Sequence, residues 1–393
     1  MNYEFFEKKI ITPKARINLT KKDKLELKKD FKSSKILILG GAGSIGSNFT
    51  LDLVEYRFKK LFIIDRDENK LSDLNRNINE KIFLNKNFSK IKNIEYICSD
   101  ISNIDLNNFL KEKKISHYLN FAAYKHVRSE ENFFSCKSLL YTNTVLPFKI
   151  GNVKNLKKLN KIFFISTDKA AYPKSIMAFS KRIMEYKLAR LSKLNPKLFI
   201  SSTRFANVSF SNGSLLKNFV EKIYRGSIIG MPANIKRFFI THQEASNICY
   251  IALLSKSRSS IVVPSSRSIE KLINLLDVLK KICKLMKKKI VYVKKISSIN
   301  AVSKNIVRVK LEKKKIVGQK EKEVFYQDNE IIENISGYKN LKKLKFNYNK
   351  NISIFDKQVK KIKNLNDIYY IRNFHLDNKI TNYRSYKKVS RII

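Results

Sequence analysis

Short apolar runs alternate with longer amphipathic stretches from about residue 35 to residue 203, and this alternation limits the fold more than any other feature of the sequence. Short apolar runs suit buried strands, and the amphipathic stretches between them suit helices. A strand, a helix and a second strand form the repeating unit of a parallel sheet. We expect six strands, at residues 36–39, 61–64, 94–98, 117–121, 161–166 and 198–202.

A glycine-rich turn follows the first expected strand, and a helix-like stretch follows the turn. Glycines in such a turn permit a tight bend, let backbone N–H groups approach a pyrophosphate, and let the helix pack closely on the strand. The helix N-terminus adds a partial positive charge. The spacing of Gly40, Gly43 and Gly46 therefore predicts a cradle for the pyrophosphate of a dinucleotide cofactor, with Ser44 and Ile45 inside it.

Residues at the ends of the next expected strands fit the rest of such a cofactor. Asp65 ends the second strand, where its carboxylate would accept from the adenosine ribose hydroxyls. It could instead cap the next helix. Arg66 could bind a 2′-phosphate, so the sequence leaves NAD and NADP both open. Four more residues complete the expected cofactor site: Asp100 and Ile101 after the third strand, and Ala122 and Ala123 after the fourth.

Six strands with intervening helices predict an α/β fold, namely a doubly wound parallel sheet of the Rossmann type. We expect residues 1–34 to form a helical N-terminal extension and residues 35–203 to form the NAD(P)-binding Rossmann domain. After about residue 204 the alternation loosens. Residues 204–393 are expected to form a smaller substrate-binding region and a Lys/Asn-rich C-terminal extension, with elements that can interleave with the Rossmann domain.

The net charge of +48 admits a nucleic-acid-binding alternative. Lysine, however, is spread along the whole chain together with abundant Ile and Asn, as AT-rich coding sequence would produce, and no Arg–aromatic stacking pattern is present. We therefore expect compositional drift and no specific nucleic-acid partner.

The four cysteines lie far apart, with no CxxC pair and no nearby histidine cluster. This spacing argues against a disulfide framework or a zinc site and fits a reducing compartment. No apolar run reaches the roughly 18–20 residues of a membrane span, and the N-terminus lacks the apolar core of a signal peptide. We expect a soluble cytoplasmic protein without a membrane span.

Polar residues that could carry chemistry follow the fifth expected strand. Thr167, Asp168 and Lys169 come first, and Met177 and Lys181 lie four residues apart further on. Residues at positions i and i+4 share one face of a helix, so this last pair would line one wall. The bland alternatives are that Asp168 and Lys169 form a helix cap with a solvated neighbour, and that Lys181 is a surface lysine.

These motifs resemble those of bacterial nucleotide-sugar 4,6-dehydratases of polysaccharide biosynthesis, chiefly UDP-N-acetylglucosamine 4,6-dehydratases, which belong to the extended short-chain dehydrogenase/reductase family. The family's usual Tyr-x-x-x-Lys reads Met177-x-x-x-Lys181 here, and several members carry Met at this site. The matching stretches cover roughly residues 35–260 in the family's order: residues 40–47, 120–127, 166–169, 177–181, 204–208 and 236–241.

The resemblance implies a reaction in three steps. A tightly bound and recycled NAD or NADP takes hydride from sugar carbon 4, water is eliminated across carbons 5 and 6, and the hydride returns to carbon 6. Asp168 and Lys169 would be the acid–base pair of the elimination, which requires a raised aspartate pKa and a lowered lysine pKa. Thr167 would hydrogen-bond the 4-oxygen, and Lys181 would hold the nicotinamide ribose. Methionine cannot take a proton, so the base for the 4-hydroxyl stays open, with Asp168, directly or through water, as the candidate.

For the substrate, the resemblance places Asn207 at the nucleotide diphosphate and pairs Arg237 with a phosphate, where its planar fork suits bidentate contact. Lys125 and His126 either contact the sugar or diphosphate or form a polar loop. Gly213 suits a turn over the sugar. We expect a nucleotide-sugar ligand and a homo-oligomer, and no metal, because His126 has no partner ligand nearby.

The match thins downstream. Relatives carry a Gly-Glu-Lys motif followed by paired glutamates, whereas one motif acid is Gln319 here and one of the pair is Val324. The Gly/Glu-rich segment of relatives is replaced by Ser-Ser-Arg-Ser at residues 265–268. Two alternatives stay open: a nucleotide-sugar 4-epimerase, and a catalytically inactive nucleotide-sugar-binding protein. Asp168 and Lys169 favour the dehydratase, since epimerisation needs no acid–base pair at carbons 5 and 6.

Overall fold

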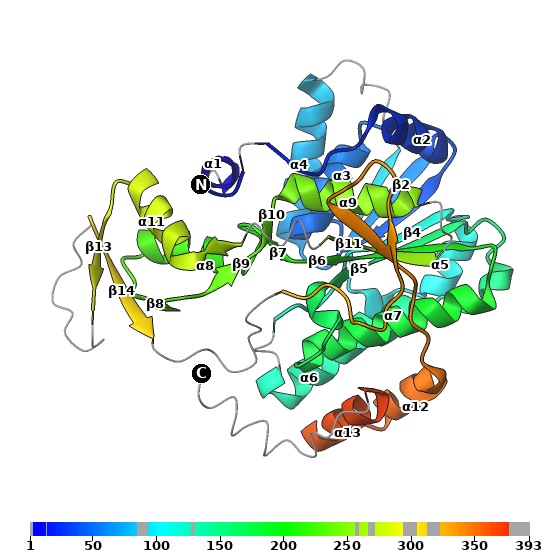
Figure 1. Ribbon diagram of the computed structural model, residues 1–393. Helices are drawn as coiled ribbons and strands as arrows, with labels where there is room; N and C mark the ends of the chain where they lie inside the picture. Colours follow the sequence, from blue (N-terminus) through cyan, green and yellow to red (C-terminus); the bar gives the residue numbers. More distant parts are fainter. Residues whose placement is uncertain are drawn as a thin grey trace.

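The computed structural model describes residues 3–12, 14–84, 93–126, 130–255, 259–265, 272–293, 305–312 and 323–376. These residues form a large lobe around a nine-stranded sheet and a smaller lobe beside it (Figure 1). None of the helices in these ranges is long and apolar enough to cross a membrane.

The large sheet has the strand order β15-β16-β11-β6-β5-β4-β1-β2-β3. Its seven strands from β3 to β11 are parallel, and β16 and β15 extend the far edge in antiparallel pairs. The six strands expected from the sequence are all present, so the α/β fold with a doubly wound parallel sheet is confirmed. The bounds are β1 (Lys35–Leu39), β2 (Lys60–Asp65), β3 (Ile94–Cys98), β4 (His117–Asn120), β5 (Lys161–Thr167), β6 (Phe199–Phe205), β11 (Ser259–Pro264), β15 (Ile332–Asn334) and β16 (Leu341–Leu344).

The strand order of the large sheet reverses between β1 and its neighbour β4. This reversal predicts where a ligand would bind. In an open α/β sheet the crevice at this reversal, beyond the carboxyl ends of the strands, is where ligands bind. The glycine turn after β1 and the loop after β4 lie at this point. One strand further along, β5 ends at Thr167.

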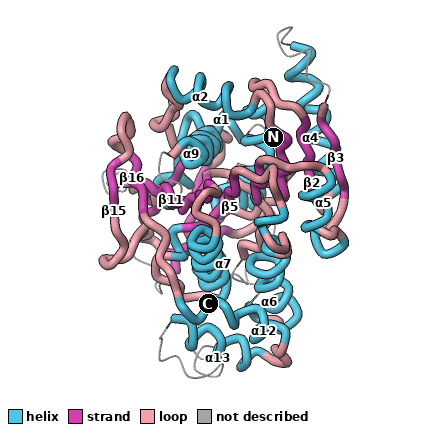
Figure 2. Tube along the Cα trace, turned by 90° about the vertical axis from the view of Figure 1, so that its right-hand side faces the viewer, coloured by secondary structure: helices cyan, strands magenta, loops and turns pink. Residues whose placement is uncertain are grey.

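Helices cover both faces of the sheet, as the end-on view of Figure 2 shows. Ile36 and Ile38 of β1 pack toward α2, α3 and α9, while Leu37 and Leu39 pack toward α5 and α7. This split follows from the two-residue alternation of a strand. The helices of this lobe are α2 (Lys21–Phe31), α3 (Ser44–Leu53), α4 (Glu68–Leu84), α5 (Leu106–Glu112), α6 (Phe133–Leu140), α7 (Ile176–Leu194) and α9 (His242–Leu254).

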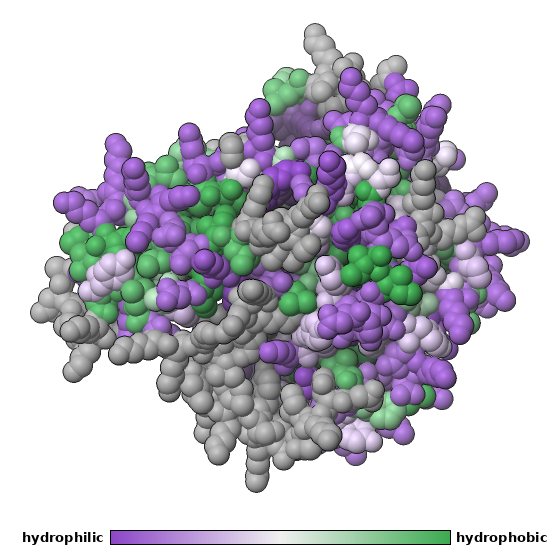
Figure 3. All heavy atoms as spheres, viewed as in Figure 1, coloured by the Kyte–Doolittle hydropathy of each residue, from purple (hydrophilic) through white to green (hydrophobic). Residues whose placement is uncertain are grey.

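The smaller lobe has a hydrophobic core of its own, made by α1, α8, α11 and a three-stranded sheet of β13, β14 and β8. The N-terminal helix α1 packs here and not with α2. In Figure 3 hydrophobic residues gather on the visible face of this lobe, and hydrophilic residues cover much of the rest. Its elements are α1 (Tyr3–Ile10), α8 (Leu215–Tyr224), β8 (Ile229–Pro232), β9 (Lys236–Arg237), β12 (Ile273–Asn274), α11 (Leu275–Leu285), β13 (Lys289–Tyr292) and β14 (Ile306–Glu312).

The two lobes are interwoven along the chain. After the smaller lobe has begun, α9 and β11 return to the large lobe, and β15 and β16 return after β14. The helices α12 (Phe355–Lys360) and α13 (Leu365–Leu376) then pack against α6 and α7. Two short strands, β7 (Asn207–Val208) and β10 (Phe239–Ile240), pair between the lobes. The short helical turns of the chain are η2 (Ile101–Asn103), η4 (Tyr141–Val145), η5 (Leu146–Phe148), η6 (Val153–Asn155), η7 (Asp168–Ala170) and η8 (Lys350–Ile354).

The strands β11, β15 and β16 were not anticipated from the sequence. Strand β11 pairs in parallel with β6 although α8, β8 and α9 intervene. Such a pairing is set by contacts between distant segments, and local apolar periodicity does not report it.

Candidate functional site

The glycine turn has the geometry of a phosphate cradle. Gly40 has a positive φ of 71°, and a Cβ there would lie 2.5 Å from the backbone nitrogen of Ala122. A Cβ at Gly46 would collide with the carbonyl oxygen of Gly40, so the start of α3 packs tightly on the turn. A Cβ on Gly43, by contrast, would contact only the carbonyl oxygen of Gly40, at 3.3 Å. No side chain caps the N-terminus of α3. The first N–H groups of the helix are therefore presented for an anion.

Asp65 holds this turn in place from the end of β2. One carboxylate oxygen accepts from the backbone N–H of Ala42 at 3.0 Å, and the other accepts from Asp67 at 3.1 Å, just before α4. Asp67, and not Asp65, caps α4, because its Oδ1 accepts from the backbone N–H of Lys70 at 3.1 Å. Arg66 extends across the site, where its Nη1 donates to the Tyr124 hydroxyl at 2.5 Å and its guanidinium lies over that ring.

Asp100 and Ile101 lie after β3, next to the end of β2. Asp100 caps the turn η2, because its Oδ1 accepts from the backbone N–H of Ser102 at 2.9 Å and from the Ser102 hydroxyl at 2.7 Å. These bonds, the backbone one first, keep the pKa of Asp100 below its usual value. Ile101 is half-buried against the core.

The loop after β4 passes directly beside the glycine turn. Ala122 donates its N–H to Asn120 Oδ1 at 3.1 Å, and the half-buried Ala123 follows. Asn143, on the π-helical turn η4, accepts from the N–H of Tyr124 and donates to its carbonyl, both at 2.9 Å. This amide therefore fixes the loop, and π-helical turns are frequent at functional sites. The sequence analysis did not single out Asn143.

Asp168 and Lys169 form a contact pair at the end of β5. Asp168 is only 3% exposed, and its Oδ1 accepts from the Thr167 hydroxyl at 2.9 Å. Lys169 Nζ lies 3.3 Å from the same oxygen, with 43% of its side chain exposed. Asp168 and Lys169 begin the turn η7, which Thr167 caps. Since β4 alone separates β5 from β1, this turn and the glycine turn leave the sheet about 10 Å apart.

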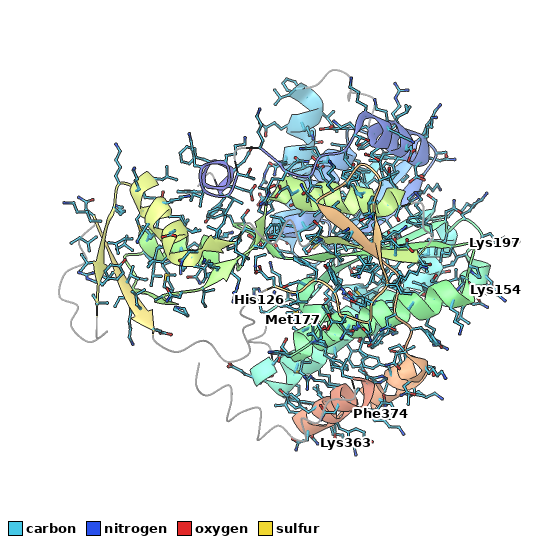
Figure 4. All side chains as sticks on the ribbon, in the orientation of Figure 1. His126, Lys154, Met177, Lys197, Lys363 and Phe374 are labelled. Atoms are coloured by element: carbon cyan, nitrogen blue, oxygen red, sulfur yellow. The ribbon has the colours of Figure 1, made fainter. Side chains whose placement is uncertain are left out.

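Lys181 is buried and not a surface lysine. Its Nζ donates to the carbonyl oxygen of Ile165 in β5 at 2.9 Å, and burial lowers its pKa to about 8. Met177 lies one turn earlier on α7, packed in the hydrophobic cluster shared by α6, α7 and α12. Its backbone N–H donates to the buried Glu130 at 2.9 Å. Figure 4 shows Met177 and His126 at the end of the sheet facing the smaller lobe, and Lys154 and Lys197 at the opposite end.

On the substrate side, Asn207 and Arg237 lie on β7 and β9. Asn207 Nδ2 donates to the carbonyl oxygen of Phe238 at 3.2 Å and to Glu323 Oε1. Arg237 is half-buried, and its charge acts on Glu323. The structure therefore brings both predicted residues to one carboxylate that the sequence analysis had not selected.

Lys125 and His126 lie in an exposed loop. Loss of hydration at the ammonium, and then repulsion by Lys217 and Lys70, lower the pKa of Lys125. The His126 ring packs against Gly213, because a Cβ on that glycine would lie only 2.5 Å from His126 Cε1. Gly213 also has a positive φ of 69°.

The turn at Gly213 also reaches the cradle. The N–H of Asn212 donates to the Ser44 hydroxyl at 2.9 Å, and Lys217 Nζ donates to the Asn212 amide oxygen at 2.6 Å. The glycine turn and the smaller lobe are thus joined through Ser44. No group of three His, Cys, Asp or Glu side chains able to hold a metal occurs among the described residues.

A buried cluster of two arginines and two glutamates lies under the turn η7. Arg204 donates to both carboxylate oxygens of Glu185 at 2.7–2.8 Å and to both of Glu330 at 2.7–2.8 Å. Arg182 Nη1 donates to Glu330 Oε1 at 2.7 Å. Burial opposes ionisation of Glu330, but the two arginines outweigh it and lower its pKa to about 2. The cluster fastens the segment that carries Glu323.

Glu323 was missed because its motif is eroded. Two acids of the relatives' motif are replaced at Gln319 and Val324, and the pattern of residues 318–324 assigned no role to the remaining glutamate. Gln319 lies outside the described residues, as do positions 266–268 of the altered Ser-Ser-Arg-Ser stretch. The surviving glutamate was the available signal.

Comparison with known proteins assigns most of the chain to one family. The family described as "Polysaccharide biosynthesis protein" matches residues 36–302. The chain belongs to this family. The match spans the cradle, the turn η7 and most of the smaller lobe.

Curated relatives are 25–28% identical to this chain over the aligned residues. The probable polysaccharide biosynthesis protein EpsC of Bacillus subtilis is 26% identical over 61% of this chain, but this is only 39% of its own length. The capsular polysaccharide biosynthesis protein CapD of Staphylococcus aureus is 25% identical over 56% of the chain and 36% of its own length. The UDP-glucose 4-epimerase of Rickettsia bellii is 28% identical over 60% of the chain and 67% of its length.

Solved structures share the fold at lower identity. Pen from Bacillus thuringiensis superimposes with a TM-score of 0.60 at 20% identity, covering 80% of this chain and 87% of that one. The UDP-N-acetylglucosamine 4-epimerase of Methanobrevibacter ruminantium, solved with UDP-N-acetylmuramic acid, gives 0.55 at 17% identity, covering 84% and 97%.

Proposed function

We propose that this chain is an NAD-dependent nucleotide-sugar 4,6-dehydratase that acts on a UDP-N-acetylglucosamine-type substrate in polysaccharide biosynthesis. The observation that carries the proposal is that two loops leave the same edge of the sheet, beside the strand-order reversal, with only β4 between them. One is the glycine cradle after β1, and the other is the buried Asp168 with Lys169 after β5. A dinucleotide on the first would bring its reactive ring toward the second.

The residues present fit an NAD molecule. The uncapped start of α3 at Gly43 suits a pyrophosphate. Asp65 at the end of β2 suits the adenosine ribose, for which an acidic residue favours the 2′-hydroxyl of NAD over the 2′-phosphate of NADP. Related structures support the choice, since WbmF of Bordetella bronchiseptica, 17% identical with a TM-score of 0.52, was solved with NADH. When bound, the nicotinamide would take hydride from sugar carbon 4 and give it back at carbon 6.

Each nearby side chain has a separate task in the proposed reaction. Lys181, held against β5 by the Ile165 carbonyl, would bind the ribose hydroxyls next to the nicotinamide. Thr167 would hydrogen-bond the 4-oxygen of the sugar. Asp168 would protonate the departing 6-hydroxyl, and Lys169 would remove the proton at carbon 5.

The contact between Asp168 and Lys169 places the acid and the base of the elimination side by side. Transfer of one proton from Lys169 Nζ to Asp168 Oδ1, across their 3.3 Å separation, makes the lysine a base and the aspartic acid an acid in one step.

A 4-epimerase is the second candidate, favoured by the UDP-glucose 4-epimerases among the relatives. It would use the same cradle and Lys181 but leave Asp168 and Lys169 without a role in elimination. The buried position of Asp168 and its shared contacts favour the dehydratase.

The deciding experiment incubates purified protein and NAD with UDP-N-acetylglucosamine and follows the product mass. We expect loss of one water. A converted sugar of unchanged mass would establish the epimerase instead. Protein that retains NAD but converts none of a panel of nucleotide-sugars would support a binding protein without catalysis.

A further inference from the structure

Asn207 has already committed both hydrogens of its amide. Nδ2 donates to the carbonyl oxygen of Phe238 at 3.2 Å and to Oε1 of Glu323. An amide nitrogen carries two hydrogens, so no N–H of this side chain is left for a ligand. A phosphate oxygen only accepts hydrogen bonds and would find no donor on Asn207.

The opposite orientation of the amide is unfavourable. It would place Oδ1 against a carbonyl oxygen and a carboxylate oxygen, which are both acceptors. Two lost bonds and the repulsion between the oxygens would result. The surroundings therefore fix which atom of Asn207 faces outward.

That atom is Oδ1. Asn207 is half-buried, and no donor to its Oδ1 occurs within the part of the chain that the structure describes. We propose that Glu323 is a positioning residue that makes Asn207 an acceptor, so that Asn207 reads a hydroxyl or amide N–H of the nucleotide-sugar and not its diphosphate. This inference rests on the proposed function, and it differs from the diphosphate contact that the family resemblance suggests for Asn207.

Glu323 is built to hold this orientation. It is 7% exposed, and its second oxygen, Oε2, accepts from the N–H of Phe238 at 2.6 Å. Two residues later, the carbonyl oxygen of Phe325 accepts from Arg204 at 2.7 Å. Arg204 is itself fixed by the buried glutamates, so the segment cannot shift without breaking that cluster.

The orientation depends on the charge of Glu323. Burial raises the pKa of Glu323 to about 7, and the charge of Asp168 adds to this while Arg237 opposes it. Protonated Glu323 could donate to Asn207 and let the amide turn over. Above pH 7 the ionised carboxylate can only accept, and Asn207 is held as an acceptor.

An exchange of the two polar groups tests the proposal. Asn207→Asp alone puts two carboxylates face to face, and we expect the dissociation constant for UDP-N-acetylglucosamine to rise at least tenfold. Asn207→Asp with Glu323→Gln restores one donor between the two side chains and still presents an oxygen to the ligand, although the Phe238 carbonyl oxygen loses its donor. The double variant should bind about fivefold more tightly than Asn207→Asp alone. If Asn207 instead donates to the diphosphate, the double variant sets a carboxylate against phosphate, and the absence of any recovery would overturn the proposal.

Titration calorimetry with NADH present, which cannot take hydride from the sugar, gives the constants, and NADH binding and thermal unfolding report on folding. If Asn207→Asp fails to fold, the proposal is tested by how the affinity of the wild type and of Glu323→Gln for UDP-N-acetylglucosamine depends on pH. Wild-type affinity should fall about tenfold from pH 8 to pH 6, as a carboxyl of pKa about 7 takes its proton. Glu323→Gln should bind weakly and without this dependence, and an unchanged pH profile in that variant would refute the proposal.

The matched control is Glu333→Gln, the same change on the exposed strand β15, which should leave binding unaltered. If the wild type binds no nucleotide-sugar, the proposed function fails. If it binds and the double variant does not recover, only this inference fails.

Discussion

Replacing Glu330 by glutamine removes one of the two negative charges in the buried cluster and leaves Arg182 and Arg204 with Glu185 alone. In the folded protein the pKa of Glu330 is about 2, against an ordinary value of 4.5. At about 1.4 kcal/mol for each pKa unit, this corresponds to about 3 kcal/mol of stability. Breaking a buried ion pair by removing one partner costs a similar amount, about 3–5 kcal/mol.

We therefore expect Glu330→Gln to lower the free energy of unfolding at pH 7 by about 3 kcal/mol. The assay is urea unfolding followed by circular dichroism, because the chain has no tryptophan. The sign of the pH effect follows from the lowered pKa. The stabilisation is complete above pH 4.5 and is lost as pH falls toward 2. The difference in the free energy of unfolding between wild type and Glu330→Gln should therefore decrease below pH 4.5.

Glu333→Gln supplies the matched control. Glu333 is close in sequence and pairs with Lys343 at 2.8 Å, but 36% of its side chain is exposed. An exposed pair contributes less than about 1 kcal/mol, because water screens it. If Glu330→Gln unfolds within about 0.5 kcal/mol of the wild type, or no more easily than Glu333→Gln, the cluster does not fasten this segment as argued.

Three further outcomes are expected. Gly40→Ala should abolish NAD retention, measured by cofactor absorbance in the purified protein, whereas Gly337→Ala, at φ 81° with open space around it, should retain NAD. Lys181→Met should abolish turnover and yet raise the free energy of unfolding at pH 7 by up to about 3 kcal/mol. The reason is that burial lowers the pKa of this lysine from 10.5 to about 8 and so penalises its charged form. The wild type should gain the same stability as pH rises from 8 to 10.5. Asp168→Asn should still oxidise carbon 4, seen as NADH absorbance, while water loss stalls; normal dehydration would remove Asp168 from the proposed role.

Local sequence patterns predicted where the glycine turn and the parallel strands around it lie. The glycine spacing, the acid at the end of the second strand and the apolar alternation each depend on residues close together in the chain. Gly40 must be glycine because its own φ is positive, and Asp65 reaches the turn because two parallel strands end side by side. The Thr-Asp-Lys turn was found for the same reason, since it directly follows a strand.

The substrate half was predicted less well, and Glu323 shows why. Its partners are Asn207, Phe238 and the charges of Asp168 and Arg237, all far away in sequence. The surrounding motif has lost two of its acids, so the surviving glutamate was the one local signal for this residue.

The sequence by itself determined the doubly wound sheet and the place of its phosphate cradle, because strand periodicity and glycine conformation are properties of short segments. Only the tertiary structure decided that β11 joins the sheet, that Arg204 fastens the segment after residue 323, and which atom Asn207 offers to a ligand. Those features depend on hydrogen bonds and charges between segments that become neighbours only when the chain has folded, and a buried polar group must find its partner wherever the fold provides one.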